Sequence, residues 1–177
     1  SRTYRSRLGE LKQYSDSATY TSYLTNYDSD GLKVNGLLTI PKGEKPEKGW
    51  PAIVFVHGYI APSTYQTTEK YGDYVNYLAR YGFVVFKIDL RGHGESEGEP
   101  GSAYNSPDYV IDTLNAREAL RASEFVDRDA IGLWGHSMAG NVTFRSFVAA
   151  KDIPALVIWA GATYSYEDLA KYGLNDN

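Results

Sequence analysis

The sequence predicts an α/β domain, and three observations lead to this fold class. Four short apolar runs lack polar alternation, which is typical of strands buried on both faces of a parallel sheet. Segments whose apolar residues recur at helical spacing separate these runs. Two longer alternating segments precede them, as expected for an antiparallel hairpin. A hairpin followed by strand–helix units predicts a mostly parallel sheet flanked by helices.

The expected hairpin lies near the N-terminus. Residues 19–27 (TYTSYLTNY) alternate and are rich in Tyr and Thr, so they are predicted to form a strand. The turn-forming sequence DSDG follows at 28–31, and the returning strand at 32–40 (LKVNGLLTI) ends before Pro41. Residues 1–18 are polar, and we expect them to form a mobile arm or a short capping segment.

The remaining elements are expected to alternate between strand and helix. The predicted strands are AIVFV (52–56), FVVFKI (83–88), IGLW (131–134) and ALVIWA (155–160). The predicted helices are 68–82, which stops at Gly82, 106–122, which starts with Ser and Pro, and 138–150. No internal repeat or linker divides the sequence, so we expect one domain over residues 19–177.

Composition and charge exclude several classes of function. The 177 residues suffice for one core, and a net charge of −4 without a basic block argues against a nucleic-acid partner. Cysteine is absent, which excludes disulfides and thiolate metal sites, and three histidines offer little for zinc. No apolar run is long enough for a membrane span. We therefore expect no cofactor and no metal, while localisation stays open between the cytoplasm and export with the signal removed.

The stretch LWGHSMAG at 133–140 places Ser137 between a predicted strand and a predicted helix. A turn this sharp strains the backbone and requires small neighbours, which Gly135, Ala139 and Gly140 supply. It exposes the serine oxygen at a helix N-terminus, where free N–H groups favour a developing negative charge. A serine that only caps the helix is the simpler alternative, but a cap does not require small residues on both sides. We therefore predict that Ser137 is a nucleophile.

With two further motifs, this turn resembles the α/β-hydrolase superfamily. VFVHGYIAP (54–62), IDLRGHGESEG (88–98) and LWGHSMAG occur in the order typical of that superfamily. Ala139 replaces the last glycine of its G-x-S-x-G pattern. The hairpin sequence DGLKVNGLLTIPKG is similar to that of prolyl oligopeptidase-like peptidases and related carboxylesterases. The resemblance runs from about residue 19 to the end, and it implies an α/β-hydrolase fold with serine hydrolase activity.

The resemblance also implies an oxyanion hole made of backbone groups. In the superfamily, the N–H just after the His-Gly pair is one donor, and the N–H after the nucleophile is the other. These positions are Tyr59 and Met138 in this sequence. A tight turn with a satisfied histidine is the simpler interpretation of His57 and Gly58, and it would be preferred if the Ser137 motif were absent.

The motif IDLRGHGESEG raises the alternative of a dinucleotide-binding domain, because glycines follow a predicted strand. The spacing G-x-G-x-x-G fails, since position 97 is Glu, and an extended loop is expected there instead of a helix. Binding of a cofactor at residues 91–98 would be the sign of that alternative. His93 is expected to be a turn residue near the cleft, not a catalytic base.

A serine nucleophile needs a base and an orienting carboxylate, and the sequence does not provide an obvious pair. No histidine follows Ser137, and His136 adjoins it on a sharp turn where neighbouring side chains point apart. Glu167 and Asp168 follow the last predicted strand, where a solvated helix start is the simpler account. We expect the triad acid and histidine to lie outside this chain, which would then be an α/β-hydrolase domain truncated after about the sixth strand.

Two classes of function follow from these motifs. The first is a serine hydrolase that cleaves a small-molecule ester or a peptide through an acyl-enzyme on Ser137, completed by a missing C-terminal segment or a second chain. The second is a non-catalytic interaction domain that keeps the fold without the triad. The apolar run ALVIWA would be an exposed edge strand, which a further segment would be expected to cover.

Overall fold

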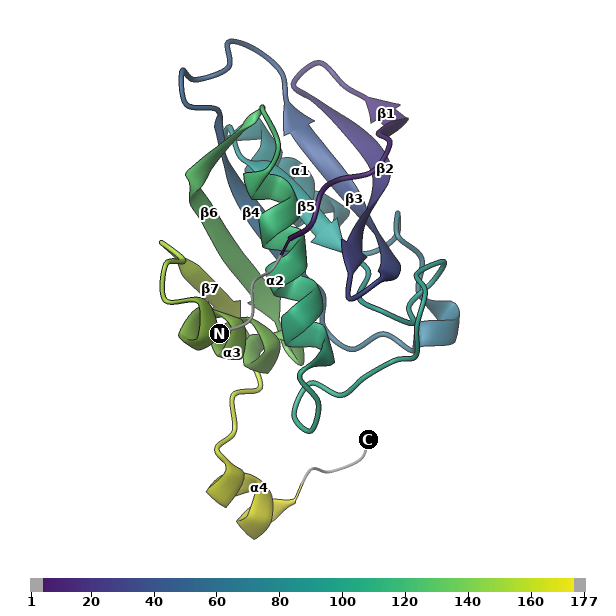
Figure 1. Ribbon diagram of the computed structural model, residues 1–177, viewed down its shortest axis with the longest axis vertical. Helices are drawn as coiled ribbons and strands as arrows, with labels where there is room; N and C mark the ends of the chain where they lie inside the picture. The colour runs from purple at the N-terminus through teal and green to yellow at the C-terminus, as the bar shows by residue number, and fades with distance from the viewer. Residues whose placement is uncertain (1–4, 174–177) are drawn as a thin grey trace.

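The computed structural model describes residues 5–173, which form a twisted seven-stranded sheet with helices on both faces (Figure 1). The strands lie in the order β1-β2-β3-β5-β4-β6-β7. They are β1 (Lys12–Asp16), β2 (Tyr20–Ser29), β3 (Leu32–Pro41), β4 (Trp50–Val56), β5 (Val84–Ile88), β6 (Val126–His136) and β7 (Leu156–Trp159).

The sheet divides into an antiparallel part and a parallel part. Strands β2 and β3 form the predicted hairpin, and β3 continues antiparallel against β5. Strand β4 pairs in parallel with β5 and β6, and β6 pairs in parallel with β7. The predicted α/β architecture is therefore confirmed, and the C-terminal ends of β4, β6 and β7 meet at one edge.

The helices cover the two faces of the sheet unequally (Figure 1). They are η1 (Pro62–Thr64), α1 (Gly72–Arg80), α2 (Asp108–Arg121), α3 (Ala139–Ala150) and α4 (Tyr166–Tyr172). Helices α2 and α3 lie on one face over the larger core, while α1 lies on the other over a smaller cluster of Phe55, Val75, Val85 and Trp134. Helix α4 stands away from the sheet.

Three local expectations differ from the structure. Residues 12–16, expected within a mobile arm or a short capping segment, form β1, which pairs with β2 and adds one strand to the six predicted. Helix α1 begins at Gly72 and not at 68, because Lys70 and Tyr71 adopt the left-handed conformation, with φ of 57° and 59°. Strand β6 begins at Val126, earlier than the predicted start at residue 131, whereas β7 lies at the sheet edge with Val157 50% exposed, as expected for an apolar edge strand.

Among residues 5–173, none of the helices combines the length and apolar character that a membrane crossing requires.

Candidate functional site

Ser137 lies at a sharp turn between β6 and α3. Its backbone is left-handed, with φ of 52°, a conformation that costs energy for any residue with a Cβ atom. The Ser137 N–H donates to the Trp159 carbonyl at 3.1 Å, and the Ser137 carbonyl accepts from Gly140 at 2.9 Å and from Ala162 at 3.0 Å. The turn is thus tied both to α3 and to the segment after β7, which holds the unfavourable backbone in place.

The small residues around Ser137 are required by close packing. A Cβ atom at Gly135 would lie 2.5 Å from both the Ala139 carbonyl oxygen and Thr143 Oγ1. A Cβ atom at Gly140 would lie 2.7 Å from the Gly161 Cα atom. Ala139 is fully buried, so the site that replaces the expected last glycine tolerates one methyl group. The pattern recognised in the sequence therefore reflects contact between α3, β6 and the β7 loop.

The loop after β4 adjoins the Ser137 turn. Strands β4 and β6 are neighbours, with Val56 opposite Gly135, so their C-terminal loops emerge side by side. A Cβ atom at Gly58 would lie 3.2 Å from Ser137 Cβ. Within the described residues, the backbone N–H groups of Tyr59 and Met138 make no hydrogen bond, and the Tyr59 side chain is 70% exposed. Two free N–H groups thus come from loops that meet beside the serine.

His57 is buried beneath this loop and contacts two backbone carbonyls. Its Nδ1 lies 2.7 Å from the Gly58 oxygen and its Nε2 lies 2.9 Å from the Asp89 oxygen. Burial lowers the pKa of His57 to about 4, so the ring is neutral at pH 7 and donates to one carbonyl at a time. The Gly58 carbonyl and the Tyr59 N–H belong to one planar peptide and point in opposite directions. The contact with His57 therefore helps to set the direction of the Tyr59 N–H.

Two charged residues that the sequence reasoning missed support the same loop from β5 and its end. Lys87 Nζ donates to the Glu69 carbonyl at 3.0 Å, and Asp89 accepts from the Tyr65 hydroxyl at 3.0 Å. Burial lowers the pKa of Lys87 to about 8 and raises the pKa of Asp89 to about 6. The sequence feature that could have identified these two residues is a pair of opposite charges within the apolar sequence FVVFKIDL. Both side chains are buried in the structure.

Each of the three histidines already contacts other groups. His136 Nδ1 lies 2.7 Å from the Tyr71 hydroxyl, and its ring stacks on Trp159 with 4.5 Å between centroids. His93 is buried, with Nδ1 3.1 Å from the Arg91 carbonyl, and His57 is held as described. Residues 5–173 hold no group of three or more His, Cys, Asp or Glu side chains that could bind a metal ion.

The loop that raised the dinucleotide alternative packs against the protein's own strands. Its backbone N–H groups at Gly92, Ser96 and Glu97 donate to the carbonyls of Glu97, His93 and Lys33, respectively. A phosphate cradle needs free N–H groups at a helix N-terminus, whereas these are already engaged and no helix begins there. The geometry therefore does not favour that alternative.

Asp168 lies at the start of α4, where it serves as a helix cap. Its Oδ2 accepts from the Ser165 hydroxyl at 2.8 Å, and the Asp168 N–H donates to Ser165 Oγ at 3.0 Å. Asp168 Oδ2 also accepts from the Ser165 N–H at 3.2 Å, so two backbone N–H groups at the start of α4 have partners. Glu167 is exposed on the same turn, and both residues lie on the helix that stands away from the sheet (Figure 1).

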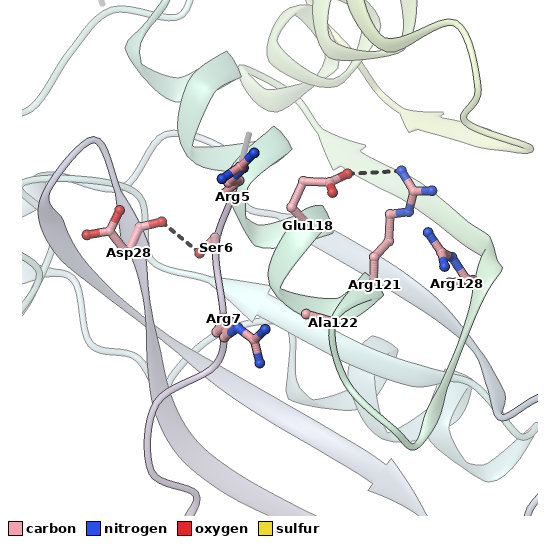
Figure 2. A pocket seen from close by; sticks show the side chains of 8 residues that line it. All are labelled: Arg5, Ser6, Arg7, Asp28, Glu118, Arg121, Ala122 and Arg128. Atoms are coloured by element: carbon pink, nitrogen blue, oxygen red, sulfur yellow. Dashed lines mark hydrogen bonds and ion pairs between the residues drawn. The ribbon is translucent and has the colours of Figure 1, made fainter. Parts of the chain in front are cut away.

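A hollow of about 520 Å³ lies on a part of the surface that does not include Ser137. Figure 2 shows the side chains that line it. It is lined by Arg5, Ser6, Arg7, Asp28, Glu118, Arg121, Ala122 and Arg128. Arg128 is near the start of β6 and Ser137 follows its end, so a strand of this length separates them by about 30 Å. Among the residues that line the hollow, the Ser6 hydroxyl is the one side-chain group that could attack a carbonyl carbon. This hydroxyl donates to the Asp28 carbonyl at 2.7 Å.

Two curated proteins are similar to this chain over part of its length. Thiohydrolase aneE of Aspergillus aculeatus is 32% identical over 111 residues, which are 63% of this chain and 32% of that protein. The probable dipeptidyl-aminopeptidase B of Penicillium rubens is 28% identical over 160 residues, which are 88% of this chain and 16% of that protein. The chain thus spans about a third or less of the length of each relative.

Solved structures share the fold. Est1E from Butyrivibrio proteoclasticus, solved with ferulic acid bound, superposes with a TM-score of 0.69 and 25% identity over 85% of this chain and 57% of that chain. Acetyl xylan esterase 1 from Thermoanaerobacterium superposes with a TM-score of 0.66 and 21% identity over 96% of this chain and 61% of that chain. The predicted α/β-hydrolase fold is confirmed. Residues 49–172 match the family described as serine aminopeptidase S33, and the chain therefore belongs to that family of hydrolases.

Proposed function

We propose that the chain carries the nucleophile and the oxyanion hole of a serine hydrolase that cleaves an ester or peptide bond through an acyl-enzyme on Ser137. The observation that carries the proposal is the left-handed turn at Ser137, which lies at the N-terminus of α3 beside the loop after β4. A helix cap alone would not account for that backbone conformation or for the close packing at Gly135 and Gly140.

The chemistry begins with attack of Ser137 Oγ on the substrate carbonyl carbon. The Oγ–H proton passes to a general base, and the carbonyl oxygen becomes an alkoxide held by the N–H groups of Tyr59 and Met138. Collapse of this intermediate breaks the bond to the alcohol or amine, which leaves with the proton from the base. Water then attacks the acyl-enzyme by the same route and releases the acid. The N–H groups at the N-terminus of α3 and the helix dipole also stabilise this negative charge.

The general base comes from outside the three histidines of this chain. His57 and His93 are buried with ring nitrogens at backbone carbonyls, and His136 is held at Tyr71. The 177-residue chain by itself should therefore hydrolyse a short-chain aryl ester only at a trace rate, because a positioned base contributes about 10²–10⁴-fold. A triad acid and histidine supplied by further residues or by a second chain should restore turnover.

A fluorophosphonate probe tests the role of Ser137. A complete protein that contains this chain should label at Ser137, and Ser137→Ala should lose both labelling and turnover. Ser165→Ala, which removes an exposed serine hydroxyl that caps α4, is the matched control and should keep both. Equal labelling in Ser137→Ala would reject the nucleophile assignment. A complete protein that does not label would instead favour a non-catalytic domain.

The substrate proposal stays at the level of an ester or peptide carbonyl. The curated relatives are named as a thiohydrolase and a dipeptidyl-aminopeptidase, and one solved relative holds ferulic acid. All three names are compatible with acyl transfer at a carbonyl group. A comparison of kcat/KM for an aryl ester and for a matched aminoacyl anilide, both abolished by Ser137→Ala, would separate the esterase from the peptidase.

A further inference from the structure

The side chain of Tyr71 links the two turns that carry the proposed oxyanion donors. Its hydroxyl oxygen accepts the Gly58 N–H at 2.9 Å, and it lies 2.7 Å from His136 Nδ1. Gly58 directly precedes Tyr59, and His136 directly precedes Ser137. One phenol group therefore contacts the loop after β4 and the turn after β6 at the same time.

Hydrogen-bond chemistry fixes the direction of the Gly58 half of this link and allows Tyr71 to donate in the other half. Gly58 N–H is only a donor, so the Tyr71 oxygen must accept from it. The single hydroxyl proton of Tyr71 is then free to be donated to His136 Nδ1. This order places the His136 ring proton on Nε2. Burial raises the pKa of Tyr71, which keeps the hydroxyl protonated and able both to accept and to donate a hydrogen bond.

Packing and backbone geometry hold the Tyr71 hydroxyl in place. The ring meets Phe55 edge-on at 5.4 Å and His136 at 5.6 Å between centroids. The Tyr71 backbone is left-handed, with φ of 59°, at the residue before α1 begins. A side chain that only filled space would not need this conformation, which is unfavourable for a bulky residue. Packing alone also leaves the two hydroxyl contacts without a role.

We propose that Tyr71 is a positioning residue, whose hydroxyl joins Gly58 to His136 and so fixes the Tyr59 N–H relative to Ser137. This inference rests on the proposed function for its catalytic consequence. The link itself concerns only hydrogen bonds within the described chain. Tyr71 does not touch the substrate in this account; it acts through the backbone of the loop after β4.

The first test measures the link without any catalytic assay. In Tyr71→Phe, the Gly58 amide should exchange its hydrogen about tenfold faster, because its acceptor is lost while the ring remains. The ¹⁵N chemical shifts of the His136 ring should also move, since Nδ1 loses its hydrogen-bond partner. Tyr74→Phe is the matched control, because Tyr74 neighbours Tyr71 on the same segment and its hydroxyl makes no hydrogen bond within residues 5–173. It should change neither signal. Unchanged Gly58 exchange in Tyr71→Phe would overturn the inference.

The second test measures the consequence for catalysis in a complete protein that labels at Ser137. Tyr71→Phe should lower kcat about 10- to 100-fold with KM within about twofold, because a small displacement of the donor affects the transition state most. Tyr74→Phe should keep kcat within about twofold. A Tyr71→Phe enzyme with faster Gly58 exchange and unchanged kcat would overturn the positioning role. If Gly58 exchange rises in Tyr71→Phe while the complete protein never labels, the link stands and the proposed function falls.

Discussion

At the scale of single residues, the proposed oxyanion hole depends on backbone groups and not on side chains. The Tyr59 side chain is 70% exposed and makes no hydrogen bond within residues 5–173, while Gly58, the residue before it, lies beside Ser137. Substitutions that keep the Tyr59 N–H should therefore be tolerated, and a substitution that removes it should not.

Tyr59→Pro and Tyr59→Phe compare a substitution that removes the backbone N–H with one that keeps it. Proline lacks the N–H. In a complete, active protein, kcat/KM should therefore fall by a factor that corresponds to about 3–4 kcal/mol of lost transition-state stabilisation, as for loss of one oxyanion donor. Tyr59→Phe keeps the N–H and should retain most activity. Circular dichroism would check that the proline variant folds, and a folded, fully active proline variant would remove Tyr59 from the proposed hole.

The sequence predicted part of this residue-level arrangement, and its physical basis explains which part. Ser137, Gly135 and Gly140 lie within six positions of one another, so a local turn pattern reveals them. Tyr71 meets Gly58 and His136 only after the chain folds, across separations of 13 and 65 residues. Spacing in the sequence carries no information about such contacts, and the sequence therefore predicts only that residue 71 lies within a helix at 68–82.

At the scale of elements, the loop after β5 is anchored by a buried ion pair. Asp112 of α2 accepts from Arg91 Nη2 at 2.8 Å, from the Arg91 N–H at 3.0 Å and from the Ser29 hydroxyl at 2.6 Å. These bonds tie the loop to α2 and to the end of β2. The loop in turn supports His57, through the Asp89 carbonyl, and so it supports the candidate site.

Asp112→Ala should therefore destabilise the fold strongly. The variant leaves the nearly buried Arg91 guanidinium without its main partner, which should cost about 3–5 kcal/mol in the free energy of unfolding. Urea denaturation would measure the loss. Asp16→Ala breaks the exposed pair of Asp16 with Lys42 and should leave the urea midpoint nearly unchanged. Similar midpoints for the two variants would contradict the anchoring role of Asp112.

Element boundaries were less predictable than element types. The periodicity identified β2 to β7 and α1 to α3, because each buries at least one apolar side on the core. It missed β1, whose residues are all exposed and which pairs with β2 without burying an apolar side chain. It also started α1 too early, since apolar spacing does not reveal the left-handed residues that precede the helix.

At the scale of the whole molecule, the two edges of the sheet differ in character. The β1 edge is polar, with the sequence KQYSD, whereas the β7 edge is the apolar sequence LVIW. Val157, Ile158 and Trp159 are each at least 36% exposed. An exposed apolar edge strand offers unpaired backbone groups to another strand, and polar or charged side chains discourage such pairing.

The 177-residue chain should therefore associate with itself through β7. Val157→Lys places a charge on this edge and should lower the average mass observed in sedimentation at high protein concentration. Tyr14→Lys makes a matched change at an exposed residue of β1 and should leave the mass distribution as it is. Equal sedimentation of the Val157→Lys variant and the wild-type chain would show that β7 is not the contact.

The left-handed backbone of Ser137 sets folding stability and chemical function against each other. Glycine is the residue that accepts a φ of 52° most readily, while a residue with a Cβ atom is held there at a cost of about 1–2 kcal/mol. A search for stabilising substitutions would therefore select glycine at this position and remove the only hydroxyl that the turn presents. The same turn would expose the proposed nucleophile, because the surrounding contacts of α3 and of the segment after β7 hold the unfavourable backbone in place. Engineering of this protein for heat resistance should accordingly leave residue 137 untouched and draw its gains from regions such as the exposed β7 edge.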